Sequence, residues 1–215
     1  MPKKTPQAFV DSGYEREEND RYWTRPDYTA TLIPHLADVG LYPRYENPVW
    51  ECAAGRGDMS KVLSKAGFRV RASDIDPKAF GILKADFLAL DFKDKEVRKK
   101  YGESVAIITN PPYGREAEKF VRRALSIPGI QVAAFLLRSN WKCPSQAGSK
   151  RPSLFTEKSA NGMRFAMEII LPERPMWDWW SKKEDGEKSN TPFHPYSWFV
   201  WSSHWKQPPT IRWGK

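Results

Sequence analysis

The chain has 215 residues, of which 40% are hydrophobic and 28% charged, a composition that is ordinary for a soluble globular protein. This length suits one domain with a full core, and two domains would be cramped. The formal net charge of +9 favours a polyanionic partner, nucleic acid first, although excess lysine also serves solubility. The longest apolar runs are too short to cross a bilayer, which argues against a membrane protein.

No apolar stretch near the N-terminus could act as a secretion signal, so the sequence predicts a cytoplasmic protein. Only two cysteines are present, Cys52 and Cys143, and free thiols are expected instead of a disulfide. The three histidines share no metal-ligand spacing with the cysteines or with one another, and no metal site is predicted. The sequence leaves the oligomeric state open.

Apolar residues at helical spacing between Tyr28 and Leu36 predict the first helix, with Asp27 as its N-cap and Gly40 as its stop. Pro34 falls inside this stretch. Because proline removes a backbone donor and clashes with the preceding turn, we expect a kink or an early break there.

A strand, a glycine turn and a helix are predicted over residues 49–67. Gly55 and Gly57 allow a tight turn, so that a ligand can lie against bare backbone. Glu51 and Asp58 would place carboxylates at the mouth of this turn. Negative charge there argues against a pyrophosphate, which prefers an uncompensated helix N-terminus, and favours a ligand with an ammonium group and hydroxyls.

The alternating stretch 69–73 predicts a second strand that ends in Asp74, with helix-like sequence beyond it. Asp74 lies 17 residues past the second glycine of the turn. This is close to the roughly twenty-residue spacing at which a carboxylate reaches a ribose diol in nucleotide-binding folds, and Ile75 would then cover one face of an adenine. Asp86 and Phe87 follow a short helical pattern and offer a third loop to the adenine edge, although Asp86 could equally cap a helix.

The hexapeptide Thr-Asn-Pro-Pro-Tyr-Gly at residues 109–114 directly follows an apolar run. That order predicts a buried parallel strand that delivers a rigid loop to the edge of a sheet. The prolines remove two N–H donors, so the Asn110 side-chain oxygen and the Pro111 carbonyl could accept both hydrogens of an exocyclic amino group. Tyr113 would supply a flat face for a planar ring. Alone, these residues are more often a simple turn after a strand.

Strand and helix patterns alternate from residue 49 onward, which predicts an α/β fold with a mostly parallel, twisted sheet and right-handed crossovers. A helix is predicted over residues 117–125 and a buried strand over 132–137. Further strands are predicted over 165–171 and 198–201.

One domain is predicted over residues 21–215, after a flexible polar arm over residues 1–20, with insertions at about 140–164 and 177–195. The first insertion has five basic residues against one acid, which favours contact with nucleic acid. Seven of the ten tryptophans lie beyond position 176, where core packing is a more frequent role than stacking on bases. The predicted nucleic-acid-binding residues are Arg138, Lys142, Lys150, Arg151, Lys158 and Arg164.

Four motifs in this order make the chain resemble a class I S-adenosylmethionine-dependent methyltransferase, specifically the enzymes that methylate N6 of adenine in DNA. Residues 51–58 resemble the first motif of the family, 73–77 the second, 85–88 the third, and 110–113 the catalytic Asn-Pro-Pro-Tyr motif. Residues 23–26 resemble the N-terminal motif, which closes over the methionine part of the cofactor. The motif order is similar to that of the gamma group.

The resemblance implies a Rossmann-like fold with helices on both faces of the sheet and S-adenosyl-L-methionine as cofactor. It implies that the ribose hydroxyls bind Asp74, and that the cofactor adenine packs on Ile75 and Phe87 and donates to Asp86. The implied cofactor-binding residues are Trp23, Thr24, Glu51, Ala53, Gly55, Gly57, Asp58, Asp74, Ile75, Asp86, Phe87 and Asn110. The implied catalytic residues are Asn110, Pro111, Pro112 and Tyr113.

The implied reaction methylates the N6 amino group of adenine in DNA after the base is flipped out of the duplex. Two alternatives keep the fold, namely methylation of an amino group in RNA or of a glutamine amide in a protein. A catalytically idle nucleic-acid-binding protein is less favoured, since Gly55, Asp74 and Asn110 are all present. The gamma group has a large C-terminal recognition domain, for which this chain has no room, and its size suggests a phage or mobile-element type. Sequence readout is therefore expected from the two insertions.

Overall fold

The structure is a computed structural model that describes residues 23–44, 48–144, 148–174 and 194–214. The predicted arm at residues 1–20 and nearly all of the predicted insertion at 177–195 lie outside the described residues. The division into an arm, one domain and two insertions stays a prediction.

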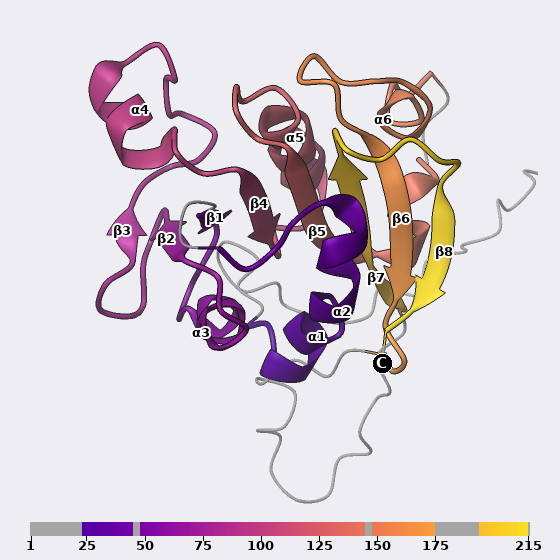
Figure 1. Ribbon diagram of the computed structural model, residues 1–215, viewed down its shortest axis with the longest axis horizontal. Coiled ribbons are helices and arrows are strands. Elements are labelled where there is room, and N and C mark those ends of the chain that lie inside the picture. The colour runs from indigo at the N-terminus through magenta and orange to yellow at the C-terminus, as the bar shows by residue number, and fades with distance from the viewer. Residues whose placement is uncertain (1–22, 45–47, 145–147, 175–193, 215) are drawn as a thin grey trace, which may run out of the picture.

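An eight-stranded sheet forms the centre of the molecule, in the strand order β3-β2-β1-β4-β5-β7-β6-β8 (Figure 1). Its strands are β1 (Val49–Glu51), β2 (Val70–Asp74), β3 (Leu83–Lys84), β4 (Ala106–Thr109), β5 (Val132–Arg138), β6 (Arg164–Ile170), β7 (Tyr196–Ser202) and β8 (Thr210–Trp213). Neighbouring strands are parallel except around β7, which is antiparallel to both β5 and β6. The predicted α/β fold with a mostly parallel sheet is confirmed.

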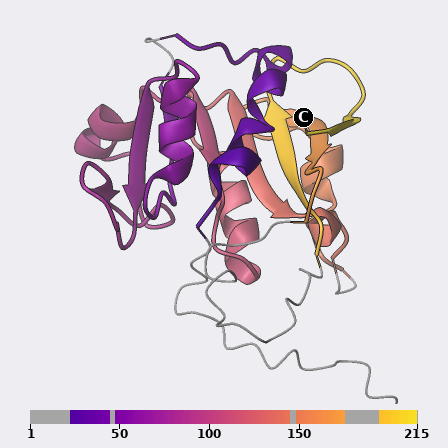
Figure 2. The ribbon, with the colours of Figure 1, turned by 90° about the horizontal axis from the view of Figure 1, so that it is seen from below.

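Helices cover both faces of this sheet (Figures 1 and 2). They are α1 (Pro26–Ala30), α2 (Ile33–Leu36), the 3-10 helix η1 (Ala37–Val39), α3 (Asp58–Lys65), α4 (Lys95–Tyr101), α5 (Arg115–Ala124), the 3-10 helix η2 (Ser139–Lys142) and α6 (Ser153–Thr156). Alternate residues of β5 separate two cores. Ala134 and Leu136 pack in the core that includes α1 to α3, whereas Ala133 and Phe135 pack in the core that includes α5.

The first helix differs from the prediction at its start and agrees with it in its break. Arg25, not Asp27, is the N-cap, because Pro26 already occupies the first helical position. Asp27 lies in the first turn and forms an ion pair with Arg25 at 2.9 Å. The expected break separates α1 from α2 just before Pro34, and Gly40 ends the segment in a left-handed conformation with φ 82°.

The prediction of a helix after β2 is wrong. Residues 77–82 form bends and a turn that lead into the two-residue strand β3, and the backbone of Lys78 donates to the Gly55 carbonyl at 3.0 Å. Pro77 and Gly81 explain this, since both residues disfavour a helix interior. The sequence reading also missed α4 and β8. Asp94 caps α4 by accepting from two backbone N–H groups.

Within the described residues, no helix combines the length and the apolar character that crossing a bilayer requires. Both cysteine thiols are free, with Cys52 buried and Cys143 exposed. No group of three or more acidic, histidine or cysteine side chains in the described part of the chain has the arrangement of a metal site.

Candidate active site

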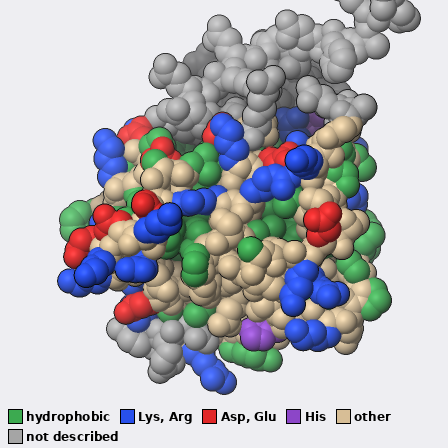
Figure 3. All heavy atoms as spheres, turned by 90° about the horizontal axis from the view of Figure 1, so that it is seen from above, with side chains coloured by type: hydrophobic (Ala, Val, Ile, Leu, Met, Phe, Trp, Pro, Cys, Tyr) green, Lys and Arg blue, Asp and Glu red, His purple; other side chains and the backbone are tan. Residues whose placement is uncertain are grey.

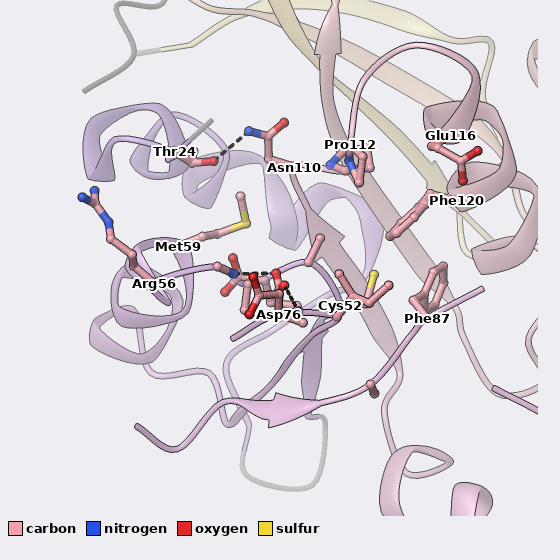
Figure 4. Close-up of a pocket in the computed structure, with 18 of the residues that line it drawn as sticks. Thr24, Cys52, Arg56, Met59, Asp76, Phe87, Asn110, Pro112, Glu116 and Phe120 are labelled. Carbon is pink, nitrogen blue, oxygen red and sulfur yellow. Dashed lines mark hydrogen bonds between the residues drawn. The ribbon is translucent and has the colours of Figure 1, made fainter. Parts of the chain in front are cut away.

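Loops at the carboxyl ends of β1, β2 and β4, together with the loop after β3, line one pocket of about 550 Å³ (Figure 4). These strands are neighbours in the sheet, so the loops that follow them meet at one edge. The volume is within the range of small-molecule sites. Most of the residues singled out from the sequence line this pocket, namely Trp23, Thr24, Glu51, Ala53, Gly55, Asp58, Asp74, Ile75, Asp86, Phe87, Asn110, Pro111, Pro112 and Tyr113.

The glycine turn after β1 is fixed by the carboxylate that ends β2. The backbone N–H of Gly55 donates to one Asp74 oxygen at 2.7 Å, and the N–H of Asp76 donates to the other at 2.8 Å. A Cβ atom at residue 55 would lie 2.5 Å from a carbon of the Trp23 ring, and φ there is 52°. Only glycine therefore fits beneath Trp23 without displacing it. Gly57 does not line the pocket; it precedes α3 with φ 75°.

Glu51 ends β1 and is 3% exposed at the inner end of the pocket. Burial raises the pKa of its carboxyl from 4.5 to about 8, and the negative charges of Asp58 and Asp74 act in the same direction. The Ser60 hydroxyl donates to Glu51, which opposes the rise. At neutral pH Glu51 is thus largely protonated, and a cation placed beside it would favour the ionised form.

Asp58 pairs with two cations and is not the N-cap of α3. Gly57 takes the N-cap position of α3, and Asp58 lies in the first turn. Its carboxylate pairs with Arg56 at 2.8 Å and with Lys61 at 3.1 Å. The Arg56 guanidinium also stacks over the Trp23 ring, 4.8 Å from its centroid. This chain of contacts orders the rim of the pocket.

The two apolar residues predicted to contact an adenine differ in exposure. Ile75 is 57% exposed at the rim of the pocket, where a planar ring could cover it. Phe87 is 1% exposed and packs against Trp50 and Phe120, with ring centroids 5.2 Å and 4.9 Å away. It therefore forms the inner wall of the pocket as part of the core. Asp86 accepts from the Leu88 backbone at 2.9 Å in a turn, and no helix follows that it could cap.

The Asn-Pro-Pro-Tyr loop is tied to the N-terminal segment. The Asn110 amide nitrogen donates to the Thr24 hydroxyl at 3.0 Å, across 86 residues of sequence (Figure 4). This bond orients the amide, because its oxygen must then point away from Thr24. The Tyr113 ring packs against Tyr196 with centroids 5.5 Å apart. Burial raises the pKa of the Tyr113 hydroxyl well above its ordinary value, so it stays neutral.

Helix α5 adds two pocket residues that the sequence reading missed, Glu116 and Phe120 (Figure 4). They are four residues apart and so share one face of the helix. A signal for them existed: α5 begins directly after the Asn-Pro-Pro-Tyr-Gly loop, which brings its first turn to the pocket. Glu116 forms an ion pair with Lys119 at 2.6 Å.

The six residues predicted to bind nucleic acid do not form one surface. Arg138 ends β5 at the same edge of the sheet as the Asn-Pro-Pro-Tyr loop, whereas Arg164 begins β6 opposite Ser202. Seven strand residues separate the two edges, about 20 Å. Lys158 and Leu125 line a second pocket of about 220 Å³. This pocket lies toward the edge of the sheet where β6 begins, opposite the Asn-Pro-Pro-Tyr loop. Seen from above, Figure 3 shows Lys and Arg side chains spread over that face with Asp and Glu between them.

Two of the remaining basic residues form ion pairs within the protein. Arg151 pairs with Glu118 at 2.9 Å and stacks over the Trp141 ring at 4.9 Å. Lys142 pairs at 2.5 Å with Glu168, a buried carboxylate on β6. The backbone carbonyl of Lys150 accepts a hydrogen bond from Arg122, and Lys150 is exposed at a bend in the chain.

The amino-acid sequence matches no protein-family model and no curated protein. The fold is similar to several solved structures. The 23S rRNA methyltransferase ErmE gives a TM-score of 0.54 at 16% identity, over 88% of this chain and 71% of that one. The type IIG restriction endonuclease BpuSI gives 0.55 at 13% identity, over 86% of this chain and 26% of that one, so this chain spans about a quarter of its length.

A protein from Lactococcus lactis provisionally named a hemolysin gives a TM-score of 0.55 at 10% identity, over 90% of this chain and 94% of that one. At such low identity these likenesses show the fold alone, and proteins with different names share it. The chain thus has the Rossmann-like class I methyltransferase fold that the motif order implied.

Proposed function

We propose that this protein is an S-adenosylmethionine-dependent methyltransferase that modifies the N6 amino group of adenine in DNA. The observation that carries the proposal is the meeting of two loops in one pocket. The loop that begins at Asp74 carries acceptors for hydroxyl groups, and the loop that begins at Asn110 carries acceptors for an amino group. A nucleoside ligand and an exocyclic amino group could therefore be held side by side.

The pocket lining fits the proposed cofactor. Carboxylates outnumber cations there, which suits a ligand with an ammonium and a sulfonium charge. The Asp74 oxygens are already oriented by two backbone donors and retain acceptor capacity for a ribose diol. Ile75 offers an exposed apolar face for the adenine. When bound, S-adenosylmethionine supplies a sulfonium methyl group that an amino nitrogen can attack.

The catalytic work of the chain is positioning and polarisation. The Asn110 oxygen and the Pro111 carbonyl would accept the two amino hydrogens and direct the nitrogen lone pair toward the methyl group. Thr24 keeps the Asn110 amide in the required orientation. Tyr113 would stack on the target base and offset part of the few kcal/mol that flipping costs. No side chain is assigned as a base, because the product ammonium loses its proton readily to water.

RNA is the second candidate acceptor, since one similar structure is named a 23S rRNA methyltransferase and the net charge of +9 suits either nucleic acid. A glutamine amide in a protein is the third. The cytoplasmic location expected from the sequence belongs to the same proposal.

The test is incubation of the purified protein with methyl-labelled S-adenosylmethionine and separate pools of duplex DNA, single-stranded DNA, RNA and protein extract. Nucleoside and amino-acid mass analysis then locates the label. Label in N6-methyladenine from DNA is the expected result. Label confined to RNA or protein would keep the reaction and overturn the DNA assignment, and absence of transfer to every pool would overturn the proposal.

A further inference from the structure

We propose that Arg138, Arg174 and His194 form a phosphate-binding cluster beside the catalytic loop, which holds the backbone of a nucleic-acid substrate. The proposal rests on the proposed function and narrows its acceptor to nucleic acid. The three residues come from the ends of three adjacent strands. Arg138 ends β5, Arg174 follows the end of β6, and His194 precedes the start of β7.

Arg138 is linked to the catalytic loop through one aromatic ring. It lies opposite Tyr196 in the β5–β7 ladder, and its Nε donates to the Tyr196 hydroxyl at 3.4 Å. The Tyr196 ring in turn packs against Tyr113. The charge of Arg138 also acts on the buried Tyr113 hydroxyl, where it partly opposes the rise of its pKa. A base stacked on Tyr113 would thus lie near this guanidinium, with the Tyr196 ring as the link between them.

The other two members converge on the same place. Arg174 and His194 are both exposed, so a ligand can reach them from solvent. The pKa of His194 is lowered, first by partial burial and then by the positive charges of Arg138 and Arg174. His194 is therefore largely neutral at pH 7 and remains a hydrogen-bond donor. The backbone geometry brings the three residues to one edge: the N–H of Ser139, next to Arg138, donates to the carbonyl of Pro195, next to His194, at 2.9 Å, and the N–H of Leu171, three residues before Arg174, donates to the Tyr196 carbonyl at 3.0 Å.

A buried carboxylate at this end of the sheet already has its own partners, and the exposed Glu173 directly precedes Arg174. Glu168 lies on β6, where Lys142 pairs with it at 2.5 Å and the Ser197 hydroxyl donates to it at 2.9 Å. The Glu168 carboxylate is therefore buried and already paired. A bound anion would be attracted by the positive charges of the two arginines.

Phosphate is the anion that this geometry and position favour. Guanidinium groups bind phosphate oxygens through paired N–H donors, and a neutral imidazole adds a further donor. A nucleotide whose base enters the pocket carries phosphates on both sides of its sugar. A glutamine side chain in a protein carries none, so the cluster would favour DNA or RNA over a protein acceptor.

The test compares Arg174→Gln and the double variant Arg138→Gln/Arg174→Gln with a matched control, Arg98→Gln. Arg98 is an exposed arginine on α4, on the far side of the sheet (Figure 1). Fluorescence anisotropy would measure binding of a labelled DNA duplex and of an RNA hairpin over a range of salt concentrations, without cofactor turnover. Thermal unfolding and calorimetric cofactor binding check that each variant is folded.

We expect the double variant to bind nucleic acid at least tenfold more weakly at about 0.1 M salt, with a slope of log K against log salt shallower by about 1 to 2. Arg174→Gln alone should show part of this loss, and Arg98→Gln should bind like the unchanged protein. Unchanged affinity and slope in folded double variants would overturn the cluster, as would failure of the unchanged protein to bind either nucleic acid. Loss of binding in a protein that transfers no methyl group would support the cluster and refute the proposed function.

Discussion

The two halves of the sheet are built differently. In the half formed by β3, β2, β1 and β4, strands are two to five residues long, and polar pocket loops follow them. In the other half, β5, β6 and β7 have seven residues each and are largely buried among aromatic side chains. The first half presents the loops that line the pocket and that bind the ligands in the proposed function, and the second half forms a wall beside them. Substitutions in the two halves should therefore affect different measurements.

The largest effect is expected at Asn110, which follows β4 where the two halves meet. Strand β4 pairs with β1 of the first half and with β5 of the second. Asn110→Ala should lower the rate of methyl transfer by about 10²- to 10³-fold, since it removes an acceptor aimed at the reacting amino group. Cofactor affinity should change far less. Single-turnover transfer and calorimetric cofactor binding measure the two quantities. Thr24→Val, which removes only the partner of the Asn110 amide, should lose less; near-normal transfer in Asn110→Ala would contradict the catalytic assignment.

Asp74→Asn tests the ligand-binding half. The substitution removes a charged acceptor that orders the glycine turn, and hydrogen bonds to charged groups contribute about 1.5–3 kcal/mol. Cofactor affinity should fall about 10- to 100-fold by calorimetry. Asp76→Asn is the matched control in the same loop, since its carboxylate forms an ion pair with Lys78 at 2.7 Å near the surface. Equal losses in both variants would mean that Asp74 has no special role.

Trp201→Phe tests the wall half. The buried Trp201 indole donates to the Leu154 carbonyl at 2.7 Å, so the smaller ring leaves an unpaired carbonyl and a cavity. The free energy of unfolding in urea should fall by roughly 2 kcal/mol, with cofactor affinity unchanged. Trp213, which is 65% exposed, provides the control, and Trp213→Phe should cost less than about 0.5 kcal/mol. A loss of cofactor affinity in Trp201→Phe would contradict the separation of stability from cofactor binding between the two halves.

The smallest effect is a pH dependence at Glu51, whose pKa is raised to about 8 by burial. Since a cationic ligand favours the ionised carboxylate, cofactor affinity should rise about tenfold between pH 6 and pH 7 as the cost of losing the proton falls. This range lies below the pKa of the ligand's own amino group. Glu51→Gln should bind weakly and with no such dependence, as measured by calorimetry at each pH. The same dependence in both proteins would assign it to another group.

The same carboxyl predicts how the unliganded protein responds to pH. Its folded-state pKa lies above the ordinary value of 4.5, so the folded state holds a proton that the unfolded state has lost. The contribution of Glu51 to stability is therefore fully present below about pH 4.5 and is lost as the pH rises toward 8.

Local sequence predicted the ligand-binding half well. The spacing of Gly57 and Asp74 indicated two loops that serve one ligand, and the structure joins the glycine turn to Asp74 by a hydrogen bond of 2.7 Å from the Gly55 N–H. This worked because each short strand is followed at once by its own polar motif. The break before Pro34 followed from proline geometry alone. The helix expected in the stretch 77–82 was wrong because Pro77 and Gly81 disfavour a helix interior, and the Lys78 backbone bonds to the glycine turn instead.

The wall half could not be predicted to the same depth. Nothing in the sequence indicates that β7 inserts between β5 and β6, or that Tyr196 packs on Tyr113. The basic residues did not locate a nucleic-acid-binding surface either, since Arg151 contacts an acid and an aromatic ring of the protein itself. Charge counts describe a segment, whereas the position of each cation depends on pairings between distant strands.

The insertion of β7 between two earlier strands also bears on synthesis of the chain. The ribosome completes β5 and β6 before β7, so the nascent chain must leave a gap between them until residue 202 has emerged. Until then both strands expose unpaired backbone edges, which invite association with other chains. Tyr196 arrives with β7, so the support of Tyr113 is completed at that same late step. A chain cut short before β7 should therefore accumulate in aggregates, while a released full-length chain completes its sheet and the packing of Tyr196 on Tyr113 together.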